Sequence, residues 1–231
     1  MKSDSPLILV VEDDRAIRRV TRAVLFASQY RVIEADTGQK ALAEVDAQHP
    51  DVMLLDLGLP DMSGLDVIRQ LKDSQRLPIV VFSAGGNHPD KIAALDAGAV
   101  DYLAKPFLNR ELLSRLRSAL HGSRGVENES TSHFTFGDLE VDLQNVRVFL
   151  GERELSLTSD EFRLMIAFAR NCGRLLTYRF LIHEAFESNT VPDQSELQAI
   201  VAQLRHKIES DPLRPRYLFA EPGVGYRFQP C

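Results

Sequence analysis

The first half of the chain alternates apolar runs with amphipathic stretches, and strand-like apolar runs occur five times. Apolar residues follow one another without interruption in runs such as LILVV and IVVF, as in strands buried on both faces of a sheet. One intervening stretch places Ile17, Val20, Val24 and Leu25 on a single helical face. This alternation predicts βαβ units and a doubly wound parallel sheet. The predicted strands are Leu7–Val11, Tyr30–Ala35, Asp51–Asp56, Pro78–Ser83 and Val100–Ala104.

The second half follows a different pattern, in which short strand-like segments come first and helices follow. A helix is predicted after Thr158, because Thr158 and Glu161 have the Thr-x-x-Glu spacing of a capping box. Further helices are predicted over Tyr178–Phe186 and Ser195–Glu209. The final segment RYLFAEPGVGYRF predicts a β-hairpin around its Pro-Gly-Val-Gly turn. The second half is therefore a separate α+β domain.

A polar segment, HGSRGVENESTSH, lies between the two patterns and has no apolar period. We therefore predict a first domain at residues 1–121, a linker at residues 122–133 and a second domain at residues 134–231. Each domain has an ordinary length for a unit with its own core.

Composition favours a soluble, cytoplasmic protein. No apolar run approaches the ~20 residues that span a bilayer, and acidic residues follow the first strand too closely for a signal peptide. The two cysteines, Cys172 and Cys231, fit neither a disulfide framework nor a metal cluster. The net charge is −6, with 15 basic and 17 acidic residues in 1–121 and 12 and 16 in 122–231. Either half could bind DNA only through a local basic patch.

Carboxylates stand at the ends of the predicted parallel strands. Glu12 and Asp13 follow the first strand, and Asp56 ends the third. The carboxyl ends of such strands share one edge of the sheet, where ligands bind. Clustered carboxylates repel one another unless a cation lies between them, and hard oxygen donors suit Mg²⁺. We therefore predict a Mg²⁺ site made of Glu12, Asp13, Asp56 and the backbone carbonyl of Gly58.

A hydroxyl and a cation come to the same edge, because Ser83 ends the fourth predicted strand and Lys105 follows the fifth. Together with a metal they suit an anion such as a phosphoryl group. Asp56 then acts as a carboxylate nucleophile and forms an aspartyl phosphate, while the metal neutralises charge on the transferring group. A lone strand-end aspartate is usually a helix cap, and a lone lysine is usually a solvated surface residue. Matching groups at four strand ends favour a site.

The motifs EDD, LLDLGLPDMSG, VFSA and YLAKPF together resemble a response-regulator receiver domain over residues 7–120. In the second half, LTSDEFRLM, LLTYRFL, QLRHKIESDP and GVGYRF resemble the winged-helix effector domain of the OmpR/PhoB subfamily. The resemblance implies a flavodoxin-like (βα)5 receiver domain joined to a winged-helix DNA-binding domain. The segments DKIAALDAGAVDYLAKPF and DPLRPRYLFAEPGVGYRF are most similar to regulators of potassium-uptake operons, which implies such genes as targets.

The resemblance also implies a sensor histidine kinase as phosphoryl donor and Asp56 as acceptor. It assigns Ser83 and Tyr102 as a switch pair, in which a hydroxyl and an aromatic ring each take two positions. The competing interpretation of Tyr102 is a half-buried core residue without a switching role.

Members of the subfamily form homodimers on activation through the fourth helix, fifth strand and fifth helix. An exposed ion pair contributes only ~0–1 kcal/mol, but each pair occurs twice across a two-fold axis. Val100 stands where many relatives carry an acid, which thins the network. The charged pairs expected on this face are Lys91 with Glu111, Asp96 with Arg117 and Asp101 with Arg115, and Leu95 adds an apolar contact.

The recognition helix of the second domain is expected to be SELQAIVAQLRHKIE, which offers Gln198 and Gln203 to base edges in the major groove. Pro222 stands where relatives often carry an arginine that enters the minor groove. With few phosphate contacts, a monomer should bind double-stranded promoter DNA weakly and a dimer should bind tandem half-sites usefully. RNA polymerase is a further candidate partner. The only basic grouping is Arg205, Lys207, Arg214, Arg216 and Arg227.

The sequence thus predicts a transcriptional response regulator and not an enzyme. One rival is a phosphatase with an aspartate nucleophile, but such enzymes need a second aspartate two residues later, where this chain has Gly58. A second rival is a regulator that acts without phosphorylation. A third is a regulator that acts through protein partners, because its recognition helix makes no DNA contact.

Overall fold

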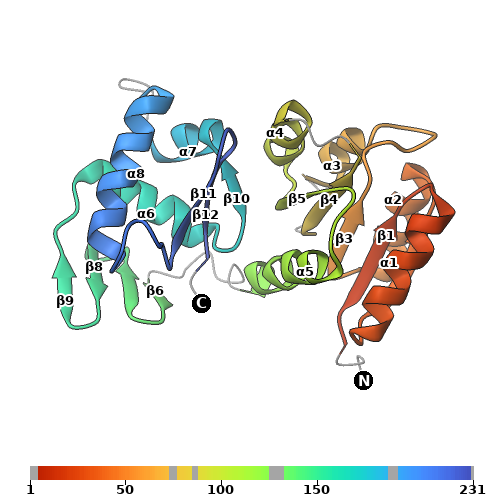
Figure 1. Ribbon diagram of the computed structural model, residues 1–231, viewed down its shortest axis with the longest axis horizontal. Coiled ribbons are helices and arrows are strands. Elements are labelled where there is room, and N and C mark those ends of the chain that lie inside the picture. Colours follow the sequence, from red (N-terminus) through yellow and green to blue (C-terminus); the bar gives the residue numbers. More distant parts are fainter. Residues whose placement is uncertain (1–4, 73–76, 85–87, 125–132, 187–191, 230–231) are drawn as a thin grey trace. The chain divides into compact units, whose positions relative to one another are not determined.

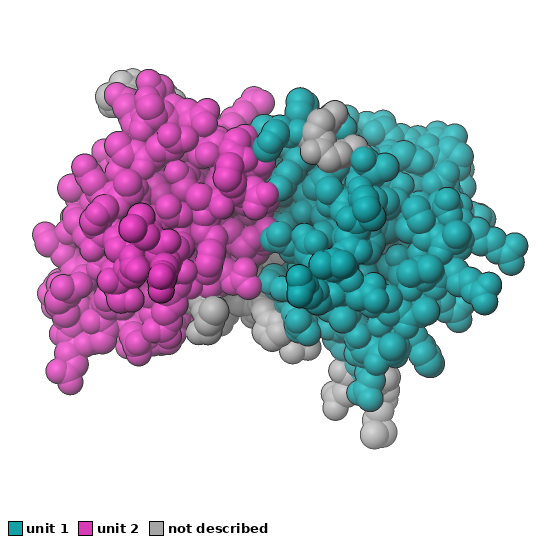
Figure 2. Space-filling view, in the orientation of Figure 1, with its two compact units in different colours: residues 1–123 teal, residues 124–231 magenta. Residues whose placement is uncertain are grey.

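The computed structural model describes residues 5–72, 77–84, 88–124, 133–186 and 192–229 (Figure 1). The chain divides into two compact units, residues 1–123 and 124–231 (Figure 2). Most of the predicted linker lies outside the described residues. Helix α5 (Asn109–Arg124) continues beyond the predicted boundary at residue 121, and strand β6 begins at His133.

The first unit contains a parallel sheet with the strand order β2-β1-β3-β4-β5. This is the order of a flavodoxin-like doubly wound fold, as predicted. Each predicted strand is present, with ends that differ by at most one residue from the prediction. The strands are β1 (Leu7–Val11), β2 (Arg31–Ala35), β3 (Val52–Leu55), β4 (Ile79–Ser83) and β5 (Asp101–Ala104).

Two cores explain why the central strands are apolar at every position. Leu9 and Val11 face a core shared with α2, α3 and α4, whereas Ile8 and Val10 face a core shared with α1 and α5. A strand covered on both faces has no solvent side for polar residues. The covering helices are α1 (Arg15–Ala27), α2 (Gly38–Gln48), α3 (Gly64–Lys72), α4 (His88–Ala97) and α5.

The predicted apolar face of α1 is wrong at one position. Val20 is 61% exposed, while Thr21 is 2% exposed and lies between Ile17 and Leu25. Residues four apart lie above one another on a helix, so Thr21 continues the row from Ile17 to Leu25. In α1, helical spacing therefore determines which residue is buried, even though Thr21 is more polar than Val20.

The second unit combines an antiparallel sheet, helices and a smaller sheet with the order β10-β12-β11 (Figure 1). The predicted helices and the terminal hairpin are present, but the three-residue strand β10 was not predicted. The elements are β6 (His133–Phe136), β7 (Leu139–Asp142), β8 (Arg147–Leu150), β9 (Arg153–Leu155), α6 (Ser159–Arg170), β10 (Leu175–Thr177), α7 (Tyr178–Ala185), α8 (Gln194–Ile208), β11 (Leu218–Glu221) and β12 (Gly225–Phe228).

Hydrogen-bonded caps define where two helices of this unit begin. The predicted box at α6 is present: the Glu161 carboxylate accepts a hydrogen bond from the Thr158 N–H at 2.6 Å, and the Thr158 hydroxyl accepts one from the Glu161 N–H at 3.3 Å. A second box, formed by Asp193 and Glu196, begins α8 one residue before the predicted start. Each box satisfies N–H groups that a helix leaves free in its first turn.

Val146, in the turn between β7 and β8, has a backbone φ of +56°. This left-handed conformation is unfavourable for a β-branched residue, and the side chain is 64% exposed, so no packing compensates. The turn is held instead by the Asp142 carboxylate, which accepts hydrogen bonds from the Gln144 and Asn145 N–H groups at 3.0 Å each.

We expect Val146→Gly to raise the free energy of unfolding by about 0.5–1 kcal/mol, because glycine adopts this φ without steric cost. Denaturant unfolding of the full chain, followed by circular dichroism, measures the change. Gly151→Ala is the reciprocal control: Gly151 has a φ of +60° and open space around its α-carbon, so alanine should destabilise through the backbone alone. A loss of stability in Val146→Gly would contradict the assignment of strain.

Candidate functional site

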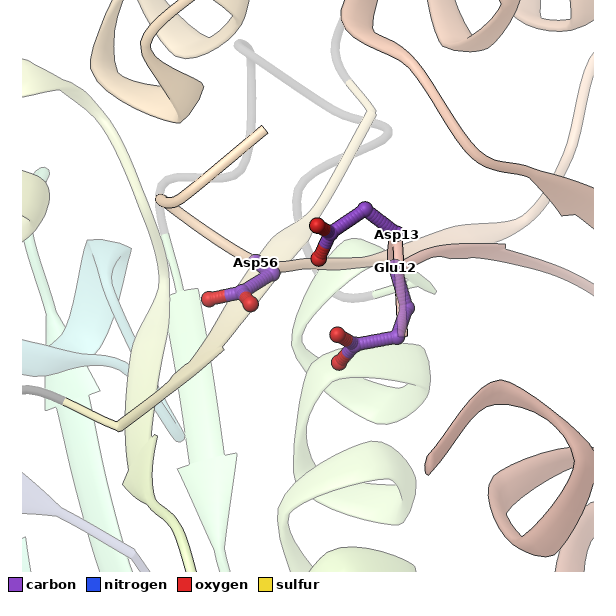
Figure 3. A group of neighbouring side chains, drawn as sticks. All are labelled: Glu12, Asp13 and Asp56. Atoms are coloured by element: carbon purple, nitrogen blue, oxygen red, sulfur yellow. The ribbon is translucent and has the colours of Figure 1, made fainter. Parts of the chain in front are cut away.

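Three carboxylates meet at the edge of the sheet where β1 and β3 end. Glu12 and Asp13 directly follow β1, and Asp56 directly follows β3. Each offers a carboxylate oxygen, and these atoms lie within 4.8 Å of one another (Figure 3). Glu12 and Asp56 are buried whereas Asp13 is exposed, so the cluster opens to solvent on the Asp13 side. The structure thus brings together the side chains that the strand-end argument grouped.

Lys105, which directly follows β5, supplies a cation to this cluster. Its Nζ donates to Asp56 Oδ2 at 2.8 Å and also to Glu12 Oε2. Burial raises the pKa of the Glu12 carboxyl above its usual range, and the contact with Lys105 partly opposes this rise. The Lys105–Pro106 peptide bond is cis. The charge of the buried carboxylates is therefore balanced from a third strand end.

The donor set fits a magnesium ion. The clustered donors are hard carboxylate oxygens from Glu12, Asp13 and Asp56, and Mg²⁺ is bound in proteins through one or more carboxylates together with retained waters. The open side at Asp13 leaves room for such waters. The need of the cluster for a cation, which Lys105 meets in part, points to the same ion.

The chain directly after Asp56 is folded tightly against it. The Leu57 N–H donates to Asp56 Oδ1 at 2.8 Å, and the Gly64 N–H donates to the Leu57 carbonyl at 3.0 Å. A methyl group on Gly64 would lie 2.5 Å from the Asp56 carbonyl oxygen and 2.7 Å from the Leu57 α-carbon. Helix α3 can begin this close to the acidic cluster only because residue 64 has no side chain.

Two further contacts at the β1 end were not foreseen from the sequence. The Arg18 guanidinium donates to the carbonyl of Glu12 and, at 3.3 Å, to that of Asp13. Asp14, the third acid of the EDD motif, caps α1 by accepting from the Ala16 and Ile17 N–H groups, and these bonds lower the pKa of its carboxyl. The sequence signal that could have predicted the Arg18 contact is an arginine one turn into the helix that follows an acidic pair. The usual role of a strand-end aspartate thus holds for Asp14 and not for Asp56.

Ser83, the last residue of β4, and Tyr102, in β5, lie on paired neighbouring strands, where Tyr102 is opposite Val81 and Ser83 is opposite Ala104. Burial raises the pKa of the Tyr102 phenol, and the Ser83 side chain opposes that rise. The ring packs into the same core as β1 and β3. The residues that the resemblance pairs as a switch therefore lie close together on neighbouring strands, with the Tyr102 ring buried in the core.

On the face expected to dimerise, Asp101 and Arg115 form their predicted charged pair within a single chain. Arg115 Nη1 lies 3.5 Å from Asp101 Oδ2, and Arg115 Nη2 lies 4.0 Å from Glu111 Oε1. Asp101 Oδ1 also accepts a hydrogen bond from the Tyr102 N–H at 2.8 Å. The remaining predicted residues lie on two helices, with Lys91, Leu95 and Asp96 on α4 and Arg117 on α5.

Helix α8 presents a polar face that carries the predicted base-contacting residues. Gln198 and Gln203 are exposed. The opposite side packs into the core of the unit through a stripe at helical spacing, formed by Leu197, Val201, Leu204 and Ile208. The amphipathic pattern thus leaves both glutamines on the solvent side of the helix.

The basic residues expected at DNA largely have partners inside the second unit. Arg205 donates from Nε and Nη2 to the Leu218 carbonyl at 3.0 and 2.7 Å. Lys207 pairs with Glu161 at 2.5 Å and Arg216 with Asp138 at 3.3 Å. Arg227 donates to the Gly173 carbonyl at 2.7 Å. Arg214 is exposed, and among the described residues it is the one member of this set without a side-chain hydrogen bond or ion pair.

The segment that joins α8 to the hairpin is fixed by a buried carboxylate. Glu209 accepts hydrogen bonds from the backbone N–H groups of Arg216 at 2.6 Å, Tyr217 at 2.9 Å and Leu218 at 2.8 Å. Together with the Arg205 contact, these bonds tie the end of α8 to the start of β11. None of them was expected from the sequence.

Comparison with known families supports the division into two functional units. Residues 8–117 match the response regulator receiver domain, and residues 152–228 match the C-terminal domain of transcriptional regulatory proteins. No helix among the described residues has the length and apolar character needed to cross a membrane.

Relatives of known name match along nearly the whole chain. The chain is 43% identical over 221 residues to the KDP operon transcriptional regulatory protein KdpE of Escherichia coli (strain K12), covering 96% of this chain and 98% of that protein. It is 39% identical to the transcriptional regulatory protein KdpE of Mycobacterium tuberculosis (strain ATCC 25618 / H37Rv), covering 96% and 99%. Among solved structures, the receiver domain of the Francisella response regulator 1452 is 28% identical, covering 52% of this chain and 99% of that chain with a TM-score of 0.50.

We expect Glu12→Gln to raise the free energy of unfolding at pH 7 in the absence of divalent metal. Burial raises the pKa of the Glu12 carboxyl, so the folded state favours the protonated, neutral form. The contribution of this protonated carboxyl to the free energy of unfolding is complete below the unfolded pKa of 4.5 and is lost as the pH rises through the folded pKa. The gain should therefore shrink as the pH is lowered towards 4.5. Urea unfolding with a chelator present, at a series of pH values, measures this.

The same titration with Mg²⁺ tests the metal site. An ion that binds only the folded state at a hundredfold excess over its Kd stabilises by about 2.7 kcal/mol, and Glu12→Gln should reduce this gain. Glu34→Gln, which changes an exposed acid on the neighbouring strand β2, is the control and should keep it. Equal Mg²⁺ stabilisation in all three proteins would rule out Glu12 as a ligand.

Proposed function

Because the chain belongs to the OmpR/PhoB type of two-component response regulators, whose members include the KdpE proteins, we propose that phosphorylation of Asp56 by a sensor histidine kinase switches it. The observation that carries the proposal is the placement of Asp56, whose carboxylate lies beside two further carboxylates and 2.8 Å from Lys105 Nζ. A nucleophilic carboxylate, an acidic metal site and a fixed cation are the parts that phosphoryl transfer to an aspartate requires.

Each residue has a distinct task in this reaction. Glu12, Asp13, Asp56 and the Gly58 carbonyl would hold Mg²⁺, which supplies neutralising charge for the transferring group. Lys105 is held at the acidic cluster, where it can pair with a phosphoryl oxygen. Asp56 Oδ1 is engaged by the Leu57 N–H, which fixes the orientation of the carboxylate.

Ser83 and Tyr102 would carry the signal away from Asp56. A phosphoryl oxygen competes with Tyr102 for the Ser83 hydroxyl, because hydrogen bonds to an anion are stronger than those to a neutral phenol. Phosphorylation would therefore draw the Ser83 hydroxyl away from Tyr102 and shift the ring to its second position. Tyr102 directly follows Asp101, which pairs with Arg115, so this change reaches the face proposed to dimerise.

The output would be transcriptional control from the cytoplasm by a phosphorylated homodimer bound to tandem half-sites. Gln198 and Gln203 supply base contacts from α8 and Arg214 supplies a phosphate contact. Few contacts per subunit make the linked dimer the binding species. The likeness to KdpE proteins favours potassium-uptake genes as targets.

The internal pairing of the basic residues favours a second candidate, a regulator whose output is a protein partner. Lys207 and Arg216 pair with carboxylates within the domain, which lowers the positive potential available to DNA, and Arg205 is held by a backbone carbonyl. RNA polymerase is such a partner for either candidate.

The test is selection of genomic DNA fragments by the full chain, with and without beryllofluoride and Mg²⁺. Beryllofluoride stands in for the phosphoryl group on Asp56. We expect enrichment of a promoter with tandem half-sites, stronger with beryllofluoride and lost in Asp56→Asn. Fragments enriched equally without beryllofluoride would indicate a regulator independent of phosphorylation, and no enrichment in either state would favour the protein partner.

The contacts of Arg205 and Arg214 predict that alanine changes protein stability at Arg205 and DNA binding at Arg214. Arg205→Ala should lower the free energy of unfolding by about 1–2 kcal/mol, because it removes hydrogen bonds to the Leu218 carbonyl and a contact with the Tyr226 ring. Arg214→Ala should leave unfolding unchanged and reduce the salt dependence of DNA binding by about one charge. Calorimetry and fluorescence anisotropy at several salt concentrations measure the two effects. Equal stability of both variants would refute the distinction.

A further inference from the structure

The loop between β3 and α3, residues 57–63, carries Gly58 and is closed at its base. Gly58 and Ser63 form an isolated antiparallel bridge, and the Gly64 N–H donates to the Leu57 carbonyl. Base contacts of this kind leave the tip of a loop free to move unless something else holds it. Asp61 lies at this tip.

The Asp61 carboxylate is bound to the first turn of a different helix. Its Oδ1 accepts a hydrogen bond from the Gly38 N–H at 2.8 Å, and its Oδ2 accepts one from the Gln39 N–H at 2.9 Å. Both N–H groups are among those that a helix leaves unsatisfied at its start, where a negative charge is also favoured. The bonds lower the pKa of the Asp61 carboxyl. Helix α2 already has its own cap, Thr37, whose hydroxyl accepts from the Lys40 N–H at 3.2 Å.

Packing reinforces these hydrogen bonds. A methyl group on Gly38 would lie 2.4 Å from Met62 Cγ and 2.7 Å from Met62 Sδ, so Met62 occupies the space beside Gly38. The loop tip is therefore held to α2 by a carboxylate and by the neighbouring side chain. The bonded residues are 23 apart in the sequence, which makes this a tertiary contact.

We propose that Asp61 is a positioning residue for the metal site, because its attachment to α2 fixes the loop that carries Gly58, whose backbone carbonyl would be a ligand. This proposal rests on the proposed function, in which Gly58 is a Mg²⁺ ligand. Mg²⁺ requires near-ideal octahedral geometry, so a backbone ligand on a loosened loop binds it less well. Asp61 acts through the loop and does not itself touch the ion.

The experiment is a calorimetric Mg²⁺ titration of the full chain in the wild type and in Asp61→Ala, Asp61→Asn and Thr37→Ala, with unfolding measured in parallel. Thr37→Ala is the matched control, since it weakens the start of the same helix but leaves the loop contacts in place. We expect Asp61→Ala to raise the Kd for Mg²⁺ at least fivefold and Thr37→Ala to change it less than twofold, although both lose stability. Amide hydrogen exchange at Gly58 and Met62 should accelerate only in the Asp61 variants.

Asp61→Asn separates hydrogen bonding from charge, because it removes the negative charge and keeps one oxygen acceptor. We expect an intermediate Kd. Equal weakening in Asp61→Asn and Asp61→Ala would assign the effect to charge and overturn the proposal, as would a wild-type Kd in Asp61→Ala. If Asp61→Ala does not fold, Met62→Ala replaces it, and a wild-type Kd in both Met62→Ala and Asp61→Asn would overturn the proposal. A wild type that does not bind Mg²⁺ would overturn the metal site itself, which distinguishes that failure from a failure of Asp61 alone.

Discussion

The acidic cluster can exist only with a cation inside it, and this requirement organises the first domain. Glu12 and Asp56 are buried and close together, and Lys105 Nζ contacts both. The three residues directly follow β1, β3 and β5, so the contact depends on the strand order of the sheet and on the register of its strands. An ion pair at this depth stabilises little by itself, because desolvation opposes attraction. Its role is to hold opposite charges close together, so that binding of a metal ion or an anion changes the local electrostatic energy.

The surrounding contacts act mainly to fix backbone near that charge. Arg18 binds the carbonyls after β1, Gly64 allows α3 to begin against the Asp56 peptide, and Asp61 binds the start of α2. Contacts with three helices thus hold the loops that carry the acids, while the acids face one another. Most of the loop geometry is therefore fixed by groups other than the clustered carboxylates, whose hydrogen bonds are to Lys105 and to the adjacent backbone.

The sequence predicted elements whose pattern is local and missed contacts whose partners are distant. Uninterrupted apolar runs placed β1, β3 and β4 of the parallel sheet to within a residue, and the alternation of strand-like and helical segments placed β2 and β5 equally well. The order of polar residues at the strand ends brought Glu12, Asp13, Asp56 and Lys105 together. Thr21 was missed because polarity outweighed spacing, and β10 was missed because three residues show no period. The bonds of Asp61 to α2 and of Arg205 to Leu218 leave no trace in spacing. For that reason the basic residues of the second domain looked more available than they are.

The ties between α8 and the hairpin have a consequence for how this domain would sense DNA. Glu209 and Arg205 bind the backbone where β11 begins, so the helix and the strand cannot slide or tilt separately. If α8 and β11 are rigidly joined, they cannot adjust to a DNA groove that is too wide or too narrow. The widths of DNA grooves vary with base sequence. Sequence selectivity would then arise partly at base pairs that no side chain touches. Its source would be the energy needed to deform the duplex until the groove fits α8 and β11.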